Sequence, residues 1–278
     1  MIPLPVHVRR LMPRIITAYS NPLVKRVQGL RDKRHRREEG LFLAEGLRIL
    51  TEALETGRVP RFLFFAAASA GHPLVRALID AVEADYGEAI ETTPDILSKL
   101  SGKDNPQTIV GIYAEPRTAL SDLDRDAAPI WLVAERLRDP GNLGTMLRTG
   151  DAVGAGGLIL LGESTDPYGV EAVRASMGAI FTQRLVQAEW DEFLPWLRSG
   201  RGELVATWLD DDTKDYQAVR YAAPTFILIG NESQGLPQAY AEAADVRVKM
   251  PMMGKADSLN AAVAAAVMAY EVLNQQRS

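Results

Sequence analysis

Residues 129–162 read PIWLVAERLRDPGNLGTMLRTGDAVGAGGLILLG, which is an apolar run, a helical pattern and a second apolar run. Further apolar runs follow at 183–187, 203–210, 224–232 and 245–252, and helical patterns separate them around 169–180 and 190–200. A closing helix is expected from Ser258 to Gln275. Apolar strands that alternate with helices predict an α/β domain with a mostly parallel sheet covered on both faces. Ligands bind such sheets at the carboxyl ends of the strands.

The chain before this domain predicts a smaller α/β domain. Residues 16–57 show helical spacing twice, so we expect two helices around a turn there. Residues 61–68 and 108–116 are strand-like, and residues 72–87 are helical. A polar stretch between two prolines then separates the domains. We therefore expect a flexible basic N-terminal extension at 1–14, the smaller domain at 15–115, a linker at 116–128 and the larger domain at 129–278.

Composition excludes several classes of protein. The 278 residues, 47% of them hydrophobic, suffice for a sizeable core. No run approaches the roughly 18 apolar residues of a membrane span, and the first residues lack the apolar core of an export signal, so a cytoplasmic protein without a membrane partner is expected. The chain has no cysteine, and His7, His35 and His72 show no metal-ligand spacing, so no metal is implied.

Charge is distributed unevenly along the chain. Residues 1–48 hold eleven lysine and arginine residues against four acids, a balance of +7, and the whole chain is −5, so the remainder is −12. A basic segment on an acidic body suits a protein that neutralises phosphates with one region. A solvated helix face is the alternative. The candidate RNA-binding residues are Lys25, Arg26, Arg31, Lys33, Arg34, Arg36 and Arg37.

The first candidate motif is Asn142-x-Gly144-x-x-x-Arg148, directly after a strand and inside the start of a helix. Gly144 permits close approach of two backbones, and we expect Asn142 and Arg148 to face the strand ends together. The planar guanidinium suits a phosphate. An arginine on an exposed helix face would produce the same pattern, so this motif is weak by itself.

The second motif is the glycine-flanked segment 230–236, GNESQGL, which follows the apolar strand FILI. A strand that leaves the core into such a turn exposes backbone N–H and C=O groups, which can hold the adenine and ribose of a nucleoside cofactor. A plain strand-to-helix turn is the alternative. Ser233 is displaced by one position from a nucleophile elbow, so that reading is excluded.

The third motif is MPMMG at 250–254 with Ser258-Leu259-Asn260, which leads into an alanine-rich helix. Ser258 is expected to cap that helix, and the alanines permit close packing. Capping and packing do not require Asn260. The glycines at 154–157 resemble a dinucleotide-binding fingerprint, but they end a helix and precede a strand, so a dehydrogenase is not expected.

Together, in this order and in these strand, loop and helix contexts, the three motifs resemble those of the SpoU/TrmH branch of the SPOUT methyltransferases over residues 128–275. The stretches 19–30 and 42–54 resemble the ribosomal-protein-like substrate-binding domain of part of that family. The resemblance implies an RNA 2′-O-ribose methyltransferase that uses S-adenosylmethionine. It also implies a homodimer with sites completed across the interface and a deep trefoil knot. General topology rules would instead predict an ordinary doubly wound sheet.

The resemblance also implies roles for individual residues. Arg148 would lie beside the 2′-hydroxyl and a neighbouring phosphate, Asn142 would position it, and Glu232 would brace the second motif. Ser258 and Asn260 would hold the substrate side of the pocket. The implied cofactor-binding residues are Thr207, Leu209, Gly230, Asn231, Glu232, Gly235, Met250, Met252, Ser258 and Leu259.

The proton acceptor and the RNA stay open at this stage. No histidine lies near the motifs, and arginine holds its proton tightly, so Arg148 is expected to orient and polarise while a phosphate or water accepts the proton. Large-subunit ribosomal RNA is the first expected substrate because of the N-terminal domain, and transfer RNA is the second. The alternatives are a non-catalytic RNA-binding or ribosome-assembly factor and a base methyltransferase of the wider SPOUT group.

Overall fold

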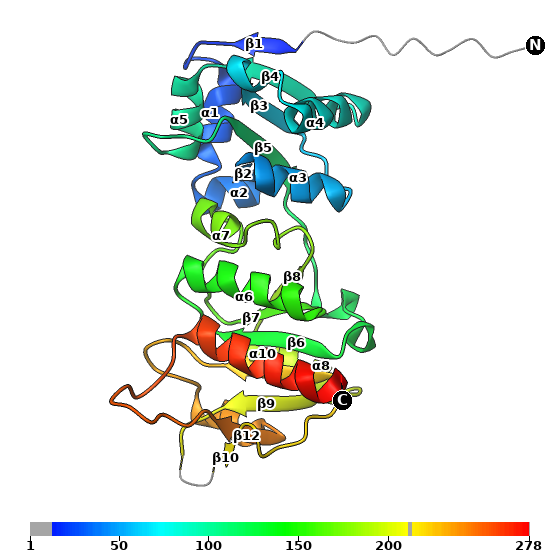
Figure 1. Ribbon diagram of the computed structural model, residues 1–278, viewed down its shortest axis with the longest axis vertical. Coiled ribbons are helices and arrows are strands. Elements are labelled where there is room, and N and C mark those ends of the chain that lie inside the picture. Colours follow the sequence, from blue (N-terminus) through cyan, green and yellow to red (C-terminus); the bar gives the residue numbers. More distant parts are fainter. Residues whose placement is uncertain (1–12, 211–212, 278) are drawn as a thin grey trace, which may run out of the picture. The chain divides into compact units, whose positions relative to one another are not determined.

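The computed structural model describes residues 13–210 and 213–277, and the chain divides into two compact units, Met1–Ala114 and Glu115–Ser278 (Figure 1). Most of the expected N-terminal extension, residues 1–12, lies outside the described residues. Arg14, its last residue, begins a strand. The expected linker at 116–128 belongs to the second unit, forms the 3-10 helices η2 (Leu120–Asp122) and η3 (Arg125–Ala127), and buries Leu123 in that unit's core.

The first unit is a five-stranded mixed sheet in the order β1-β4-β3-β5-β2. Helices α1 and α5 pack together over it, and α3 packs beside α4 on the other side (Figure 1). The strands are β1 (Arg14–Ile16), β2 (Leu41–Glu45), β3 (Phe62–Ala66), β4 (Glu88–Thr92) and β5 (Ile109–Ala114). The helices are α1 (Pro22–Gly29), α2 (Lys33–Glu39), α3 (Leu47–Glu55), η1 (Ala67–Ser69), α4 (Pro73–Ala84) and α5 (Pro94–Ser101).

The prediction of two helices within residues 16–57 is wrong. The segment holds three helices and the strand β2, and β4 with α5 was not expected at all. Every residue of β2 is buried, so it shows no polar and apolar alternation, and it is short enough to read as the start of the next helix. Gly40 at φ 62° and Gly46 at φ 101° mark its two ends, since both are conformations that favour glycine.

The second unit is a seven-stranded sheet in the order β10-β12-β9-β11-β6-β7-β8, and all its recorded neighbours pair in parallel. This agrees with the mostly parallel sheet expected. Its strands are β6 (Ile130–Glu135), β7 (Gly157–Leu161), β8 (Arg184–Ala188), β9 (Glu203–Thr207), β10 (Lys214–Asp215), β11 (Thr225–Ile229) and β12 (Val246–Lys249). Its helices are α6 (Pro140–Val153), α7 (Val170–Ala175), α8 (Trp190–Arg198), α9 (Gln238–Ala243) and α10 (Ala261–Arg277).

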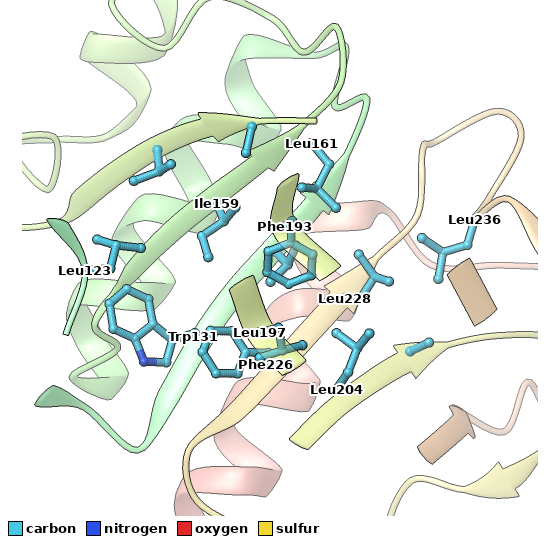
Figure 2. Close-up of a cluster of buried hydrophobic side chains, with 14 residues drawn as sticks. Leu123, Trp131, Ile159, Leu161, Phe193, Leu197, Leu204, Phe226, Leu228 and Leu236 are labelled. Carbon is cyan, nitrogen blue, oxygen red and sulfur yellow. The ribbon is translucent and has the colours of Figure 1, made fainter. Parts of the chain in front are cut away.

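Alternate residues of the central strands face different helical layers. Figure 2 shows the side chains between the sheet and one of these helical layers. Trp131 and Phe226, from neighbouring strands, stack at 5.8 Å between ring centroids, and Phe193 and Leu197 of α8 cover them. Helices α6 and α10 pack against each other over the other face of the same strands (Figure 1). Burial of aromatic and branched side chains on both faces is the dominant stabilising contribution to such a sheet.

Two further expectations bear on the chain path. Gly154 ends α6 with φ 67° and β7 begins at Gly157, so the helix-then-strand reading of these glycines is confirmed. The trefoil knot stays a prediction. Within the described ranges, no helix is long and apolar enough to cross a membrane.

Candidate active site

Three strands of the second unit end beside one pocket. The carboxyl ends of β9, β11 and β12 supply Thr207, Ile229 and Lys249 to its wall, and the start of α10 supplies Ala261 and Ala264. Its volume is about 470 Å³, within the range of roughly 300–1,000 Å³ that small-molecule sites occupy. All ten residues expected to bind a cofactor line this pocket, so the structure brings together segments from three distant parts of the sequence.

A chain of hydrogen bonds joins the three motifs beside the pocket. Asn260 Nδ2 donates to Asn142 Oδ1 at 2.9 Å, and Asn142 Nδ2 donates to Glu232 Oε1 at 2.9 Å. The other carboxylate oxygen of Glu232 accepts from the backbone N–H of Arg138 at 3.4 Å. Asn142 is buried, so both ends of its amide are satisfied by neighbouring side chains. We call the Asn260, Asn142 and Glu232 side chains the polar chain.

Asn231 shapes the second motif and ties it to the segment that precedes the first motif. Its Oδ1 accepts from the backbone N–H and the hydroxyl of Ser233, and its Nδ2 donates to the carbonyl of Arg136 at 2.6 Å. Backbone bonds between Asn231 and Gly235 close the loop in both directions. A Cβ at Gly230 would lie 2.5–2.6 Å from the backbone of Gly235 and Leu236, so this glycine permits the closure.

The cap of α10 is Asn260, and the expectation that Ser258 caps it is wrong. Asn260 Oδ1 accepts from the backbone N–H of Ala262 at 2.9 Å and of Val263 at 3.3 Å, the N2 and N3 contacts of a helix cap. The helix therefore begins at Ala261. Ser258 is exposed and lines the pocket instead. One asparagine thus anchors both the helix and the polar chain.

Arg148, which was expected to face the strand ends together with Asn142, is like Asn142 not among the residues that line this pocket. It is exposed on α6, whereas Asn142 is buried. Six helical residues correspond to a rotation of about 240° and a rise of about 9 Å, which separates the two side chains around and along the helix. The expected close approach at Gly144 is confirmed, because a Cβ there would lie 2.4 Å from Ala175 of α7.

The pocket also contains residues that the sequence analysis missed. Among them, Trp208 and Asp257 stand next to residues that were expected there, so proximity in sequence to Thr207 and Ser258 was an available signal. Leu236, Leu259 and the two alanines of α10 give an apolar wall that fits an adenine ring. The carboxylates of Asp257 and Glu232 complement the positive charge of a sulfonium. The residues present therefore fit S-adenosylmethionine.

A buried carboxyl group lies beside the first motif. Glu135 ends β6 with its side chain 2% exposed, and burial raises its pKa although Arg136 Nε lies 3.4 Å from it. The next residue, Arg136, has φ 42°, an uncommon conformation for a residue with a side chain. Glu135 thus holds its proton to a higher pH than an exposed glutamate does.

The candidate RNA-binding cations of the first unit differ in their contacts. Arg36 is 3% exposed and donates to the carbonyl of Leu30, so its expected place on the RNA surface is wrong. Arg26 pairs with Glu39 at 2.6 Å, which lowers the pKa of that carboxyl, and Arg34 pairs with Glu38 at 2.8 Å. The others are exposed and form no ion pair with any described residue: Lys25, Arg31, Lys33 and Arg37.

A parallel sheet with a pocket of this size at the carboxyl ends of its strands is typical of an α/β domain that binds a small molecule. A family model described as the SpoU rRNA methylase family matches residues 129–270, and one described as the MRM3-like substrate binding domain matches residues 21–111. The chain belongs to the SpoU rRNA methylase family. The family resemblance inferred from the three motifs is therefore confirmed.

Similar proteins cover nearly the whole chain. The 23S rRNA (uridine(2479)-2′-O)-methyltransferase of Streptomyces viridochromogenes is 33% identical over 90% of this chain and 88% of its own length. The 23S rRNA (guanosine(2553)-2′-O)-methyltransferase of Bacillus subtilis is 26% identical over 92% of this chain and 98% of its own length. A crystal structure of an AdoMet-bound rRNA methyltransferase from Sinorhizobium meliloti has a TM-score of 0.88 at 36% identity, covering 95% of this chain and 99% of that one.

Proposed function

We propose that this protein transfers the methyl group of S-adenosylmethionine to the 2′-hydroxyl of a nucleotide in large-subunit ribosomal RNA. Family membership supports this, as do two relatives that are named as 23S rRNA 2′-O-methyltransferases and align along almost their whole length. The AdoMet-bound neighbour supports the cofactor. A cytoplasmic location is part of the proposal, because the two named relatives come from bacteria, which assemble their ribosomes in the cytoplasm.

The polar chain is the observation that carries the proposal. It converts three separated motifs into one fixed edge of the pocket, since Asn142 is held from both sides at 2.9 Å. When bound, S-adenosylmethionine supplies an electrophilic methyl carbon on a sulfonium. The protein must then align the acceptor oxygen while the hydroxyl proton passes to a phosphate or water, and good alignment is worth roughly 7–11 kcal/mol in reactions of this type. Asn142 and Glu232 are the side chains proposed to fix that alignment.

Arg148 is proposed to act in the pocket of a second copy of the chain. Its exposure on α6 leaves its guanidinium available to a partner, and it does not line its own pocket. Helix α10 packs against α6 and exposes Val263 (46%) and Tyr270 (48%), seven residues apart and therefore on one side of the helix. A two-fold homodimer through these helices would cover the apolar side chains and bring each Arg148 to its partner's site.

Methylation of purified ribosomal RNA with tritiated cofactor tests the proposed function. Ribosomal RNA lacking the modification should accept tritium, and alkaline hydrolysis should leave the label in a resistant dinucleotide, because a 2′-O-methyl group blocks cleavage of the next bond. Label in mononucleotides would indicate a methylated base. Label only in transfer RNA, or in no RNA, would contradict the substrate.

Mixing two inactive variants tests the shared site. Arg148→Ala and Asn142→Ala should each be inactive as homodimers, yet half of the heterodimers' sites would combine an intact Arg148 with an intact Asn142. Random exchange should therefore restore about a quarter of wild-type activity. A mixture that stays inactive while light scattering shows exchanged dimers would contradict a site shared between copies.

A further inference from the structure

The two helical layers of the first unit carry opposite charge. Helices α1, α2 and α5 contain seven lysine and arginine residues and three acids, whereas α3 and α4 contain two and four. Polyanion binding depends on such local excess and not on the net charge of the chain. The helices α1, α2 and α5 therefore form the favoured RNA face, and the α3 and α4 layer does not.

An exposed aromatic ring lies on the basic layer. Tyr19 is 47% exposed in the loop between β1 and α1, and Lys99 Nζ of α5 lies 6.0 Å from the centre of its ring. That distance is at the outer limit of a cation–π contact, so the ammonium is not held tightly against the ring. The guanidinium of Arg31 lies against the backbone of Gly102, three residues after Lys99. A Cβ added at Gly102 would lie only 2.3 Å from it.

Tyr86 provides an internal comparison because it is 99% exposed in the same unit but on the α4 side. Its chain neighbours include Asp85 and Glu88, and no lysine or arginine of the described residues is recorded over its ring. The acids around an exposed tyrosine repel a phosphate backbone. A tyrosine beside cations can instead hold a base while the cations hold the phosphates. A comparison of Tyr19 with Tyr86 therefore distinguishes the effect of exposure alone from the effect of exposure on a basic face.

We propose that Tyr19 stacks on an unpaired base of the RNA substrate, with Lys99 and Arg31 contacting the phosphates on either side of that nucleotide. Stacking on an aromatic ring is the common way in which proteins hold single-stranded RNA, because every base offers a flat face. The inference rests on the proposed function, since it names how the first unit would hold the same substrate. It assigns to the first unit a defined contact beyond general charge attraction.

Fluorescence anisotropy with a labelled oligouridylate of about twelve nucleotides, a length within the usual range of single-strand sites, tests the stacking contact. Tyr19→Ala should raise the Kd about tenfold, the size of one lost base stack. Tyr19→Phe keeps the ring and should bind within about twofold of wild type, as should Tyr86→Ala. Lys99→Ala should reduce the slope of log Kd against log salt by about 0.7, the value for one phosphate contact on a single strand, and Lys99→Arg should keep it.

Turnover with ribosomal RNA gives the second readout. Tyr19→Ala should raise the KM for RNA while kcat at saturating RNA and the calorimetric Kd for S-adenosylmethionine stay at wild-type values. Wild-type oligonucleotide affinity in Tyr19→Ala would overturn the inference, and so would an equal loss in Tyr19→Phe or Tyr86→Ala. If the wild type methylates no ribose but its oligonucleotide binding depends on the Tyr19 ring, the proposed function fails and the stacking contact stands.

Discussion

The two units arrange their polar groups in opposite ways. In the second unit, hydrogen bonds join the side chains of Asn260, Asn142 and Glu232 beside the pocket and restrain them. In the first unit, the cations Lys33 and Arg37 extend into solvent, without an ion pair to any residue that the structure describes. Methyl transfer needs atoms aligned to fractions of an ångström, whereas attraction of a phosphate backbone needs only charge nearby. Under the proposed function, the restrained side chains would serve the reaction and the exposed cations would serve capture of the substrate.

Arg148→Ala should give the largest loss on the catalytic side of this comparison. Loss of one charge-stabilising donor costs about 10²–10³-fold in kcat, and Arg148 lines no part of its own chain's pocket. The Kd for S-adenosylmethionine should therefore stay unchanged in calorimetry. Arg184→Ala, an exposed arginine at the amino end of β8, is the matched control and should keep full activity. Full activity in Arg148→Ala would refute the role assigned to it.

Asn142→Asp should separate the two bonds of the polar chain. The introduced carboxylate can still accept from Asn260, but it faces the Glu232 oxygen that now lies 2.9 Å from Asn142 Nδ2. Two carboxylates this close raise the pKa of one of them. At pH 8 we expect a loss of about a hundredfold in kcat, the order of a misplacement of about 1 Å, with partial recovery relative to wild type as the pH falls. A pH-independent defect would contradict the proposed link.

Arg36→Ala and Arg37→Ala should have different effects although the two residues are adjacent. Arg36 is buried with a hydrogen bond to Leu30, so its loss should lower the free energy of unfolding by about 2 kcal/mol in urea titrations. Arg37→Ala should leave stability unchanged and weaken RNA binding two- to threefold, with a shallower salt dependence. Equal effects of the two substitutions on RNA affinity would show that exposure does not decide which cations contact RNA.

Asn260→Asp and Asn260→Ala should separate the helix cap from the polar chain. Aspartate caps a helix as well as asparagine does, whereas alanine costs about 1 kcal/mol of stability. Both variants lose the donor to Asn142, and we expect about a fivefold decrease in kcat from that bond. Asn260→Asp should therefore lower kcat without lowering the temperature of thermal unfolding, whereas Asn260→Ala should lower both. A wild-type kcat in Asn260→Asp would show that the hydrogen bond from Asn260 to Asn142 does not contribute to the reaction.

Sequence patterns predicted more of the second unit than of the first. Its central strands β6 and β11 are buried throughout because both faces of the sheet are covered, so these strands were predictable from apolar runs, and the pocket residues were expected from the family resemblance. Strand β2 was missed because five buried residues carry no periodicity. Asn260 and Arg36 show a further limit: which polar side chain caps a helix or enters the core depends on the distances after folding, and residue type alone does not decide this.

The most direct measurement is a map of 2′-O-methylation over total RNA from cells with and without the gene. The account predicts that one ribose methyl in large-subunit ribosomal RNA disappears, and that a plasmid carrying the wild-type gene restores it while one carrying Arg148→Ala does not. An unchanged ribosomal profile, or a loss confined to transfer RNA or to a base methyl, would contradict the account.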